Sequence, residues 1–328
     1  MTRALQAYPK VELHLHLEGC LTPAEGVRLA SKAPAAVAPA SIKALYRHGS
    51  LQEFLAHFGQ LVSLFKRPED LRWLLERVLL RLKRQGVVYA EIRVSPSVWE
   101  RHGLDPEPPL QHLLALVGKG PIPFALIVDA VRQWDRRLIE RDLDLALKYR
   151  QRGVAAFGLG GDESAAPAAR LKWVADECRR RRMPVIPHAG EALGPEEVAS
   201  AIAVFSPRRI GHGTAVARDE ELMKSVAEGG IHLEVCPTSN LRTGVVKRAK
   251  DHPLKTLWRG GLSLSLGTDD PGLFGSTLCS ELEWAADHAG WCLADMARSQ
   301  AMAARSAFLP ERERNNLERM ILAAWPDF

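Results

Sequence analysis

Eight short apolar runs recur along this chain, and most segments between them have helical periodicity. The runs are rich in β-branched and aromatic residues, and they span residues 11–17, 87–94, 124–131, 154–160, 184–190, 209–213, 231–237 and 262–270. Alternation of buried-looking strands with amphipathic helices predicts a parallel sheet. Eight such units favour a (β/α)8 TIM barrel, an α/β fold. The alternative is a doubly wound sheet, which usually carries a glycine-rich loop after its first strand. This chain has HLEGCLTP there instead.

The stretch between the first two runs is too long for one crossover and predicts a helical insertion after the first strand. Extra helices are also expected after the last run. The predicted extra helices span residues 51–65, 68–86, 276–290, 293–309 and 312–325. The alanine- and proline-rich residues 31–43 are expected to form a loop. The 328 residues are interpreted as one domain, 1–328, because a barrel with insertions reaches this length.

Composition argues against several other classes of protein, namely nucleic-acid-binding, membrane-spanning and secreted proteins. The net charge of +5 is small for the length, and the basic run Arg179–Arg182 is interpreted as a solvated helix end, so no nucleic-acid partner is expected. No apolar stretch is long enough for a membrane span, and the first ten residues lack the core of a secretory signal. Five scattered cysteines without a CxxC pair indicate reduced thiols and a cytoplasmic protein. The sequence carries no signal for the oligomeric state.

Polar residues gather where the predicted strands end. In a barrel these ends form one face, and catalytic groups lie there. Five of the runs end in such residues, namely His14, His16, Gly161, Asp162, Glu163, His188, Glu191, His212, Asp269 and Asp270. A purely structural core would avoid most of these side chains.

His14 and His16 are two residues apart, so their side chains point to the same face of the first strand. A lone inward histidine is more often a hydrogen-bonded core residue than a ligand. Two of them, together with His188 and Asp269, make three imidazoles and a carboxylate. This set suits Zn²⁺, although Fe²⁺ or Mn²⁺ accepts similar ligands.

The segments PKVELHLHLEG, GGDES, HAGE, IGHGT and SLGTDDPGLF, in this order and spacing, resemble the adenosine deaminase family of the amidohydrolase superfamily. The resemblance implies zinc-dependent hydrolytic deamination of a 6-aminopurine nucleoside, giving a 6-oxopurine and ammonia. It assigns His14, His16, His188 and Asp269 as metal ligands. Binuclear amidohydrolases usually have a carboxylated lysine at the end of the fourth strand. GLGGDES has none, which favours one zinc per chain.

The same resemblance implies roles for other residues. His212 would orient the attacking water and can take its proton; the alternative is a structural histidine beside the site. Glu191 would protonate ring N1 of the purine; the alternative is a glutamate of a helix first turn. Asp270 would receive a hydrogen bond from N7 or position the water. Gly161 would offer its N–H to N3, and His16 would face the substrate as well as the metal.

Substrate identity rests on weaker signals. Adenosine deaminases usually carry an aspartate that contacts the ribose where this chain has Glu18, so the resemblance implies that Glu18 binds the substrate, though it would reach a different hydroxyl. Adenine deaminases and the aminodeoxyfutalosine deaminases of bacterial menaquinone synthesis carry glutamate there. The second and third runs look more like the aminodeoxyfutalosine group, whose substrate has an aryl carboxylate. Arg93 and Arg132 would suit that carboxylate, and Trp99 or Trp134 its ring. The alternative is internal ion pairs and core tryptophans.

Other functions remain as alternatives. Adenosine or adenine deamination in purine salvage would use the same site. Another mononuclear amidohydrolase, acting on a lactone, amide or phosphoester, would share the histidine pair and the aspartate but would not need Glu191 or Gly161. A non-catalytic barrel would not need the full set of ligands, acid and base.

Overall fold

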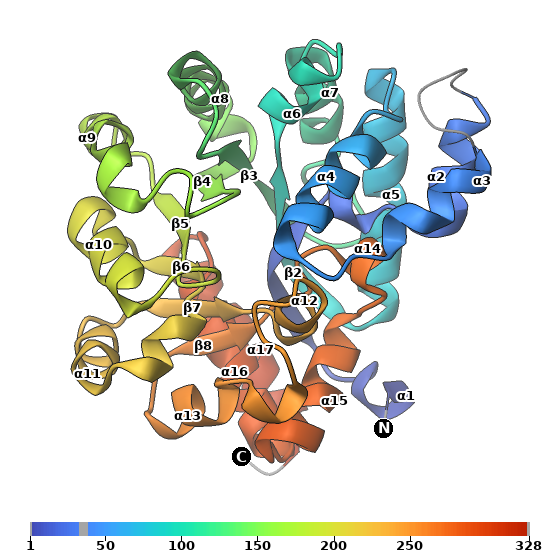
Figure 1. Cartoon of the computed structure of the whole chain (residues 1–328). Coiled ribbons are helices and arrows are strands. Elements are labelled where there is room, and N and C mark those ends of the chain that lie inside the picture. The colour runs from blue at the N-terminus through green and yellow to red at the C-terminus, as the bar shows by residue number, and fades with distance from the viewer. Residues whose placement is uncertain (1, 33–38, 327–328) are drawn as a thin grey trace.

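The computed structural model describes residues 2–32 and 39–326, and it has eight parallel strands in one sheet that follows the sequence order (Figure 1). The strands are β1 (Lys10–His16), β2 (Val87–Val94), β3 (Phe124–Val131), β4 (Val154–Gly160), β5 (Val185–Ala189), β6 (Arg209–His212), β7 (His232–Val235) and β8 (Leu264–Leu266). A parallel bridge between Leu15 and Asp269 brings the last strand back to the first. The predicted (β/α)8 barrel is confirmed.

Helices surround this barrel, and α8 to α11 lie on its outer side in Figure 1. The helices of the chain are α1 (Thr2–Leu5), α2 (Pro23–Ala30), α3 (Pro39–Ile42), α4 (Leu51–Val62), α5 (Pro68–Arg84), α6 (Pro96–Arg101), α7 (Glu107–Leu114), α8 (Arg136–Lys148), α9 (Lys172–Arg180), α10 (Pro195–Phe205), α11 (Glu220–Glu228), α12 (Pro237–Arg242), α13 (Leu254–Arg259), α14 (Pro271–Phe274), α15 (Leu278–Ala289), α16 (Leu293–Ser306) and α17 (Glu311–Ala324). The insertion after β1 and the extra carboxyl-terminal helices are therefore present. The loop predicted over residues 31–43 includes the short helix α3, and its residues 33–38 lie outside the described part.

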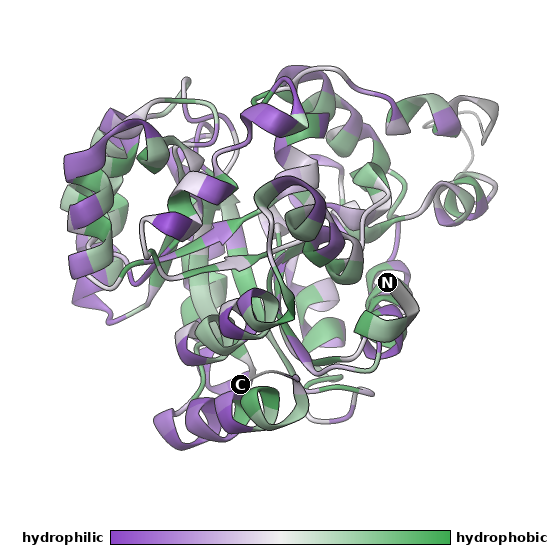
Figure 2. Cartoon of the chain, turned by 90° about the horizontal axis from the view of Figure 1, so that it is seen from below, coloured by the Kyte–Doolittle hydropathy of each residue, from purple (hydrophilic) through white to green (hydrophobic). Residues whose placement is uncertain are grey.

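The inserted helix α5 illustrates why these segments are helical. Pro68 occupies the first turn, where its missing N–H costs nothing. Asp70 accepts hydrogen bonds from the backbone N–H groups of Lys66 and Arg67 and so caps the amino end. Its buried apolar residues recur at helical spacing, at Leu71, Leu74, Leu75, Val78, Leu79 and Leu82. Figure 2 shows hydrophilic and hydrophobic residues alternating along helices in the same way.

The first strand shows how the barrel positions its polar residues. Leu13, Leu15 and Leu17 are at most 1% exposed and pack in the hydrophobic core. His14 and His16 alternate with these leucines and face the interior. Since all strands are parallel, their carboxyl ends open on one face, and side chains of α4 and α6 line the cavity there. Within the described residues, no helix combines the length and apolarity needed to cross a membrane.

Candidate active site

A cavity of about 330 Å³ opens at the carboxyl ends of the strands. It brings together most of the site residues predicted from the strand ends. Those that line it are His16, Gly161, His188, Glu191, His212, Asp269 and Asp270. His14 lies behind them and is fully buried. Asp129, which the sequence analysis did not single out, also lines the cavity.

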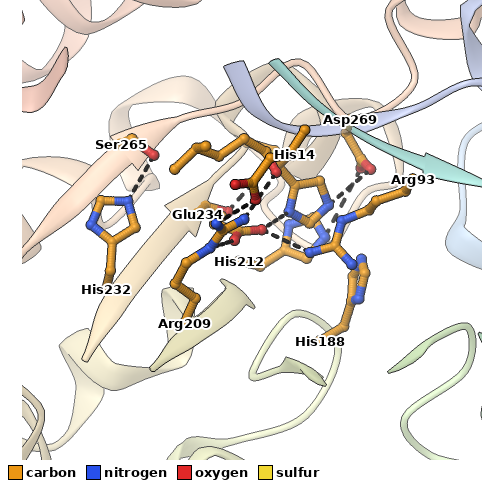
Figure 3. Close-up of polar contacts among 12 residues, drawn as sticks. His14, Arg93, His188, Arg209, His212, His232, Glu234, Ser265 and Asp269 are labelled. Atoms are coloured by element: carbon orange, nitrogen blue, oxygen red, sulfur yellow. Dashed lines mark hydrogen bonds and ion pairs between the residues drawn. The ribbon is translucent and has the colours of Figure 1, made fainter. Parts of the chain in front are cut away.

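Histidines and the Asp269 carboxylate lie together at the inner end of this cavity. Figure 3 labels His14, His188, His212 and Asp269 in this cluster. Candidate ligand atoms of His14, His188, His212 and Asp269 all lie within 4.8 Å of one another. His16 joins the cluster through Asp269, because its Nε2 is 3.3 Å from Asp269 Oδ1. His16 and His188 also form a second group of this kind with Asp129. Among the described residues, these two overlapping groups are the places where a metal ion fits.

The distances in this cluster match the ligand shell of one metal ion. A tetrahedral zinc with bonds of about 2.0–2.1 Å places neighbouring ligand atoms about 3.3–3.4 Å apart. Asp269 Oδ1 lies 3.3 Å from His14 Nε2 and 3.3 Å from His16 Nε2. His14 Nε2 is buried and makes no hydrogen bond. His212 Nε2 is farther away, at 4.0 Å from the other oxygen of Asp269, so the geometry favours His16 over His212 as a ligand.

Neighbouring groups orient the ring nitrogens of the cluster. His14 Nδ1 donates to Glu234 Oε2 at 2.7 Å, and His188 Nδ1 donates to the Leu159 carbonyl at 3.0 Å. Both bonds leave Nε2 facing the cluster, as in metal sites whose histidines have carboxylate or carbonyl partners. Ser239 Oγ donates to Asp269 Oδ2 at 2.6 Å. Burial, with the charge of Arg93, lowers the pKa of His188 well below its usual value, which favours the neutral imidazole that binds metals.

Arg93 does not reach the cavity. It is fully buried, and its guanidinium donates to Glu234 Oε2 at 2.8 Å and to Asp129 Oδ1 at 3.2 Å. Arg209 donates to the other oxygen of Glu234 at 2.6 Å. Glu234 therefore links two buried arginines to His14, as Figure 3 shows. This carboxylate fixes the orientation of His14 within a charge-compensated network.

Arg132 is also used inside the fold. It is 1% exposed, and it donates to the His188 carbonyl at 2.8 Å and to Glu197 Oε1 at 2.9 Å. The structure therefore supports the internal ion pairs that were the alternative for Arg93 and Arg132, and it corrects the expectation that they face a substrate carboxylate. The physical reason is that each guanidinium compensates buried carboxylates that would otherwise be costly.

The two tryptophans differ. Trp99 is 1% exposed, and its Nε1 donates to Glu18 Oε1 at 2.7 Å, so it belongs to the core and not to a ring-binding surface. Trp134 lines the cavity. Glu18 itself is buried, accepts a second hydrogen bond from the backbone of Ser95, and has no hydrogen-bond partner at Oε2. Burial raises the pKa of Glu18 to about 7.

Glu191 and His212 form the acid–base part of the cavity. His212 Nε2 lies 3.5 Å from Glu191 Oε2. The Glu163 carboxylate accepts hydrogen bonds from the backbone N–H groups of Glu191 and Leu193, at 3.0 and 3.1 Å, and so holds the loop that carries Glu191. Burial, with the negative charges of Asp269 and Glu163, raises the pKa of Glu191 well above its usual value. Glu191 is therefore suited to carry a proton at neutral pH.

Asp269 and Asp270 can share the site because β8 has already ended at Leu266 and Asp269 has a left-handed backbone with φ of +59°. Asp270 Oδ1 is buried without a hydrogen-bond partner, and burial beside Asp269 raises the pKa of Asp270 well above its usual value. A Cβ on Gly19 would lie 1.7 Å from Asp270 Oδ1. Glycine at position 19 therefore allows the close approach of Asp270.

Sequence reasoning missed Asp129, Glu234 and Ser239. The first two left a signal, because each is an acidic residue inside a buried strand, and a buried carboxylate needs a partner. Ser239 left no such signal, because a serine after a strand is common in loops. Its role appears only in the folded chain, where α12 brings Ser239 beside Asp269 in the segment after β8.

Comparison with known proteins agrees with this site. The family model described as "Adenosine deaminase" matches residues 9–324. An aminodeoxyfutalosine deaminase from Streptomyces avermitilis is 34% identical, over 85% of this chain and 80% of the relative. An adenine deaminase from Agrobacterium fabrum is 31% identical, over 94% and 96%. The crystal structure of an adenine deaminase from Arthrobacter aurescens superposes with a TM-score of 0.89 at 25% identity, covering 97% of this chain and 99% of that one.

The buried histidine–aspartate cluster, the cavity above it and the match over nearly the whole chain lead to one conclusion. The chain belongs to the adenosine deaminase family and is a metal-dependent purine deaminase.

Proposed function

We propose that this protein hydrolytically deaminates a 6-aminopurine nucleoside and that aminodeoxyfutalosine is its preferred substrate. The products are the 6-oxopurine nucleoside and ammonia. The observation that carries the proposal is one cavity that joins the histidine–aspartate cluster and Glu191 to a wide apolar wall. Similarity to an aminodeoxyfutalosine deaminase at 34% identity supports the choice of substrate.

His14, His16, His188 and Asp269 are proposed to hold a single zinc ion. Zinc bound there lowers the pKa of a coordinated water to about 7 and so supplies the nucleophile. His212 lies beside this position and orients the attacking oxygen toward the purine. Glu234 and Ser239 keep His14 and Asp269 in place through the hydrogen bonds described above.

Glu191 is proposed to protonate ring N1. Its raised pKa keeps the carboxyl protonated until the purine binds, and protonation at N1 makes C6 more electrophilic. N7 of such a nucleoside has a lone pair and no hydrogen. Asp270, whose pKa is also raised, therefore donates to N7 in this proposal and does not accept from it. Gly161 lines the cavity with φ of +96°, and its N–H is proposed to meet N3.

The apolar wall would receive the aryl group of the substrate. Its side chains come from the helical insertion, the loop after β3 and α6, and they are Leu51, Phe54, Leu55, Phe58, Val98 and Trp134. Arg93 and Arg132 are not available to the carboxylate. His102 lines the cavity, and burial, with the positive charges of Lys66 and Arg101, lowers its pKa. We place the carboxylate of the substrate beside His102, where the charges of Lys66 and Arg101 attract an anion.

A second candidate is adenine deaminase, because an adenine deaminase is 31% identical over 94% of the chain. Free adenine would leave the apolar wall uncovered. The discriminating experiment measures kcat/KM for aminodeoxyfutalosine, adenosine and adenine by the change in purine absorbance. The proposal expects aminodeoxyfutalosine to have the highest value by at least tenfold, and a higher value for adenine would reject it.

A pair of variants tests the wall separately. Trp134→Ala removes an aromatic surface from the cavity, and we expect kcat/KM for aminodeoxyfutalosine to fall about tenfold, since aromatic contacts contribute about 0.5–1.5 kcal/mol beyond burial. The value for adenine should change less than twofold. Leu80→Ala is the control, because Leu80 is 47% exposed on α5 and does not line the cavity. Equal losses for both substrates would contradict the proposed contact.

A further inference from the structure

Two buried polar residues lie on the Nδ1 side of the His212 ring, whereas Glu191 and Asp269 lie on its Nε2 side. Asn240 is fully buried on α12, and His252 is 7% exposed in the segment before α13. Neither lines the cavity. They form a continuous chain of hydrogen bonds from the backbone of Leu254 to the ring of His212.

The hydrogen bond at Leu254 determines which atoms donate and which accept along this series of hydrogen bonds. The backbone N–H of Leu254 lies 3.1 Å from His252 Nδ1. A backbone N–H can only donate, so His252 Nδ1 accepts and carries no hydrogen. Burial lowers the pKa of His252 to about 4, which keeps the ring neutral. Its single hydrogen is therefore on Nε2.

The next link follows from that hydrogen. His252 Nε2 lies 3.2 Å from Asn240 Oδ1, and the donor–acceptor match fixes the carbonyl oxygen of the amide on this side. The amide NH₂ of Asn240 then faces His212 Nδ1, at 3.2 Å. An amide nitrogen has no lone pair to offer, so it donates and His212 Nδ1 accepts. The hydrogen of the neutral His212 ring must then be on Nε2.

Neighbouring groups and the local backbone hold Asn240, His252 and His212 in place. Asn240 is held by its helix and by a hydrogen bond from Val246 N to its backbone carbonyl at 2.9 Å. The ring of Trp284 packs edge-on against His252, with centroids 5.0 Å apart. His212 has a left-handed backbone with φ of +60°, a conformation that is uncommon for residues other than glycine and is retained where the fold requires it.

We propose that Asn240 and His252 are positioning residues that hold His212 in the tautomer with hydrogen on Nε2, so that His212 orients the attacking oxygen by donating a hydrogen bond to it. This rests on the proposed deamination at the same site. It replaces the expectation that His212 takes a proton from the water, because a neutral ring with hydrogen on Nε2 has no free lone pair facing the cavity.

Asn240→Asp separates the two roles of His212. A carboxylate has the same shape as the amide but accepts from both neighbouring rings, so it places the hydrogen of His212 on Nδ1 and leaves Nε2 bare. We expect kcat to fall at least about 100-fold with KM within threefold, since a wrong histidine tautomer costs about 10⁴ in a serine protease. An unchanged or higher kcat would overturn the proposal, because a bare Nε2 is what a general base needs.

His252 offers a matched pair of variants. His252→Gln keeps an N–H that can reach Asn240 Oδ1, and we expect at least one third of the wild-type kcat. His252→Leu removes the donor and leaves the Asn240 amide free to rotate, so kcat should fall at least tenfold at unchanged KM. Equal effects of the two substitutions would count against an orienting role for the hydrogen bond.

Nitrogen NMR of the zinc-loaded, ¹⁵N-histidine-labelled protein reads the tautomer directly. The signals of His212 are those missing from the spectrum of His212→Gln. We expect a protonated Nε2 and a bare Nδ1, reversed in Asn240→Asp; a protonated Nδ1 in the wild-type protein would refute the inference even if a variant fails to fold. Because this readout needs no substrate, it distinguishes failure of the inference from failure of the proposed function.

Discussion

Replacing Arg93 by methionine tests whether this arginine serves the fold or the substrate. Methionine keeps the length of the side chain and removes two charge-assisted hydrogen bonds, to Glu234 at 2.8 Å and to Asp129 at 3.2 Å. Arg209 still compensates Glu234, whereas the nearest potential cation left to Asp129 among the described residues is His16, at 3.6 Å. Each such bond contributes about 1.5–3 kcal/mol. We therefore expect a loss of about 3–5 kcal/mol in the free energy of unfolding, typical of a broken buried pair.

Urea denaturation of the metal-loaded protein measures this loss. Arg72→Met is the control, because Arg72 is 43% exposed and pairs with Glu76 on the same helix face. That pair contributes about 0.3–0.5 kcal/mol. Any loss of kcat/KM in Arg93→Met, relative to the wild-type protein, should be the same factor for aminodeoxyfutalosine and for adenine. Unchanged stability, together with a loss confined to the substrate that carries a carboxylate, would refute the internal role of Arg93.

The other predictions concern the metal, the acid and a buried carboxyl. Ser239→Ala removes the hydrogen bond to Asp269, and zinc affinity measured by chelator competition should fall about 10–100-fold; unchanged affinity would contradict this role. Glu191→Gln should lower kcat about 10²–10⁴-fold while zinc content stays the same, and normal turnover would exclude Glu191 as the proton donor. Burial raises the pKa of Glu281 from 4.5 to about 7, so its ionisation destabilises the fold increasingly as pH rises through that range. Glu281→Gln should therefore stabilise the protein by up to about 3 kcal/mol at pH 8 and by nothing near pH 4, and a benefit that does not grow with pH would contradict the assigned cause.

Much of the barrel was predictable because its strands are continuous apolar runs between turn residues. The bounds predicted for the second, third and fourth strands, such as 87–94, match β2 to β4. The last apolar run extends to residue 270, although the DDPG at its end is a turn signal that predicts the strand to stop by Thr268. In the structure β8 ends at Leu266, and Asp269 has a left-handed backbone.

The candidate site, like the barrel, was predictable from the sequence only in part. The strand-end histidines and aspartates were predictable because barrel topology gathers strand ends on one face. The roles of Arg93 and Arg132 were not, because their partners are remote in sequence. Glu234 lies 141 positions from Arg93, and no local pattern links them. From the sequence alone, a strand-end arginine that pairs inside the barrel cannot be distinguished from one that faces the cavity.

Zinc titration of the metal-free protein tests the central claim most directly. Zinc is added in sub-stoichiometric steps while deamination of aminodeoxyfutalosine and of adenine is followed by purine absorbance and ammonia release. We predict no turnover without metal and a linear rise in activity that stops at one zinc per chain. Full activity in the metal-free protein, or zinc bound at one per chain without turnover of any aminopurine, would contradict it.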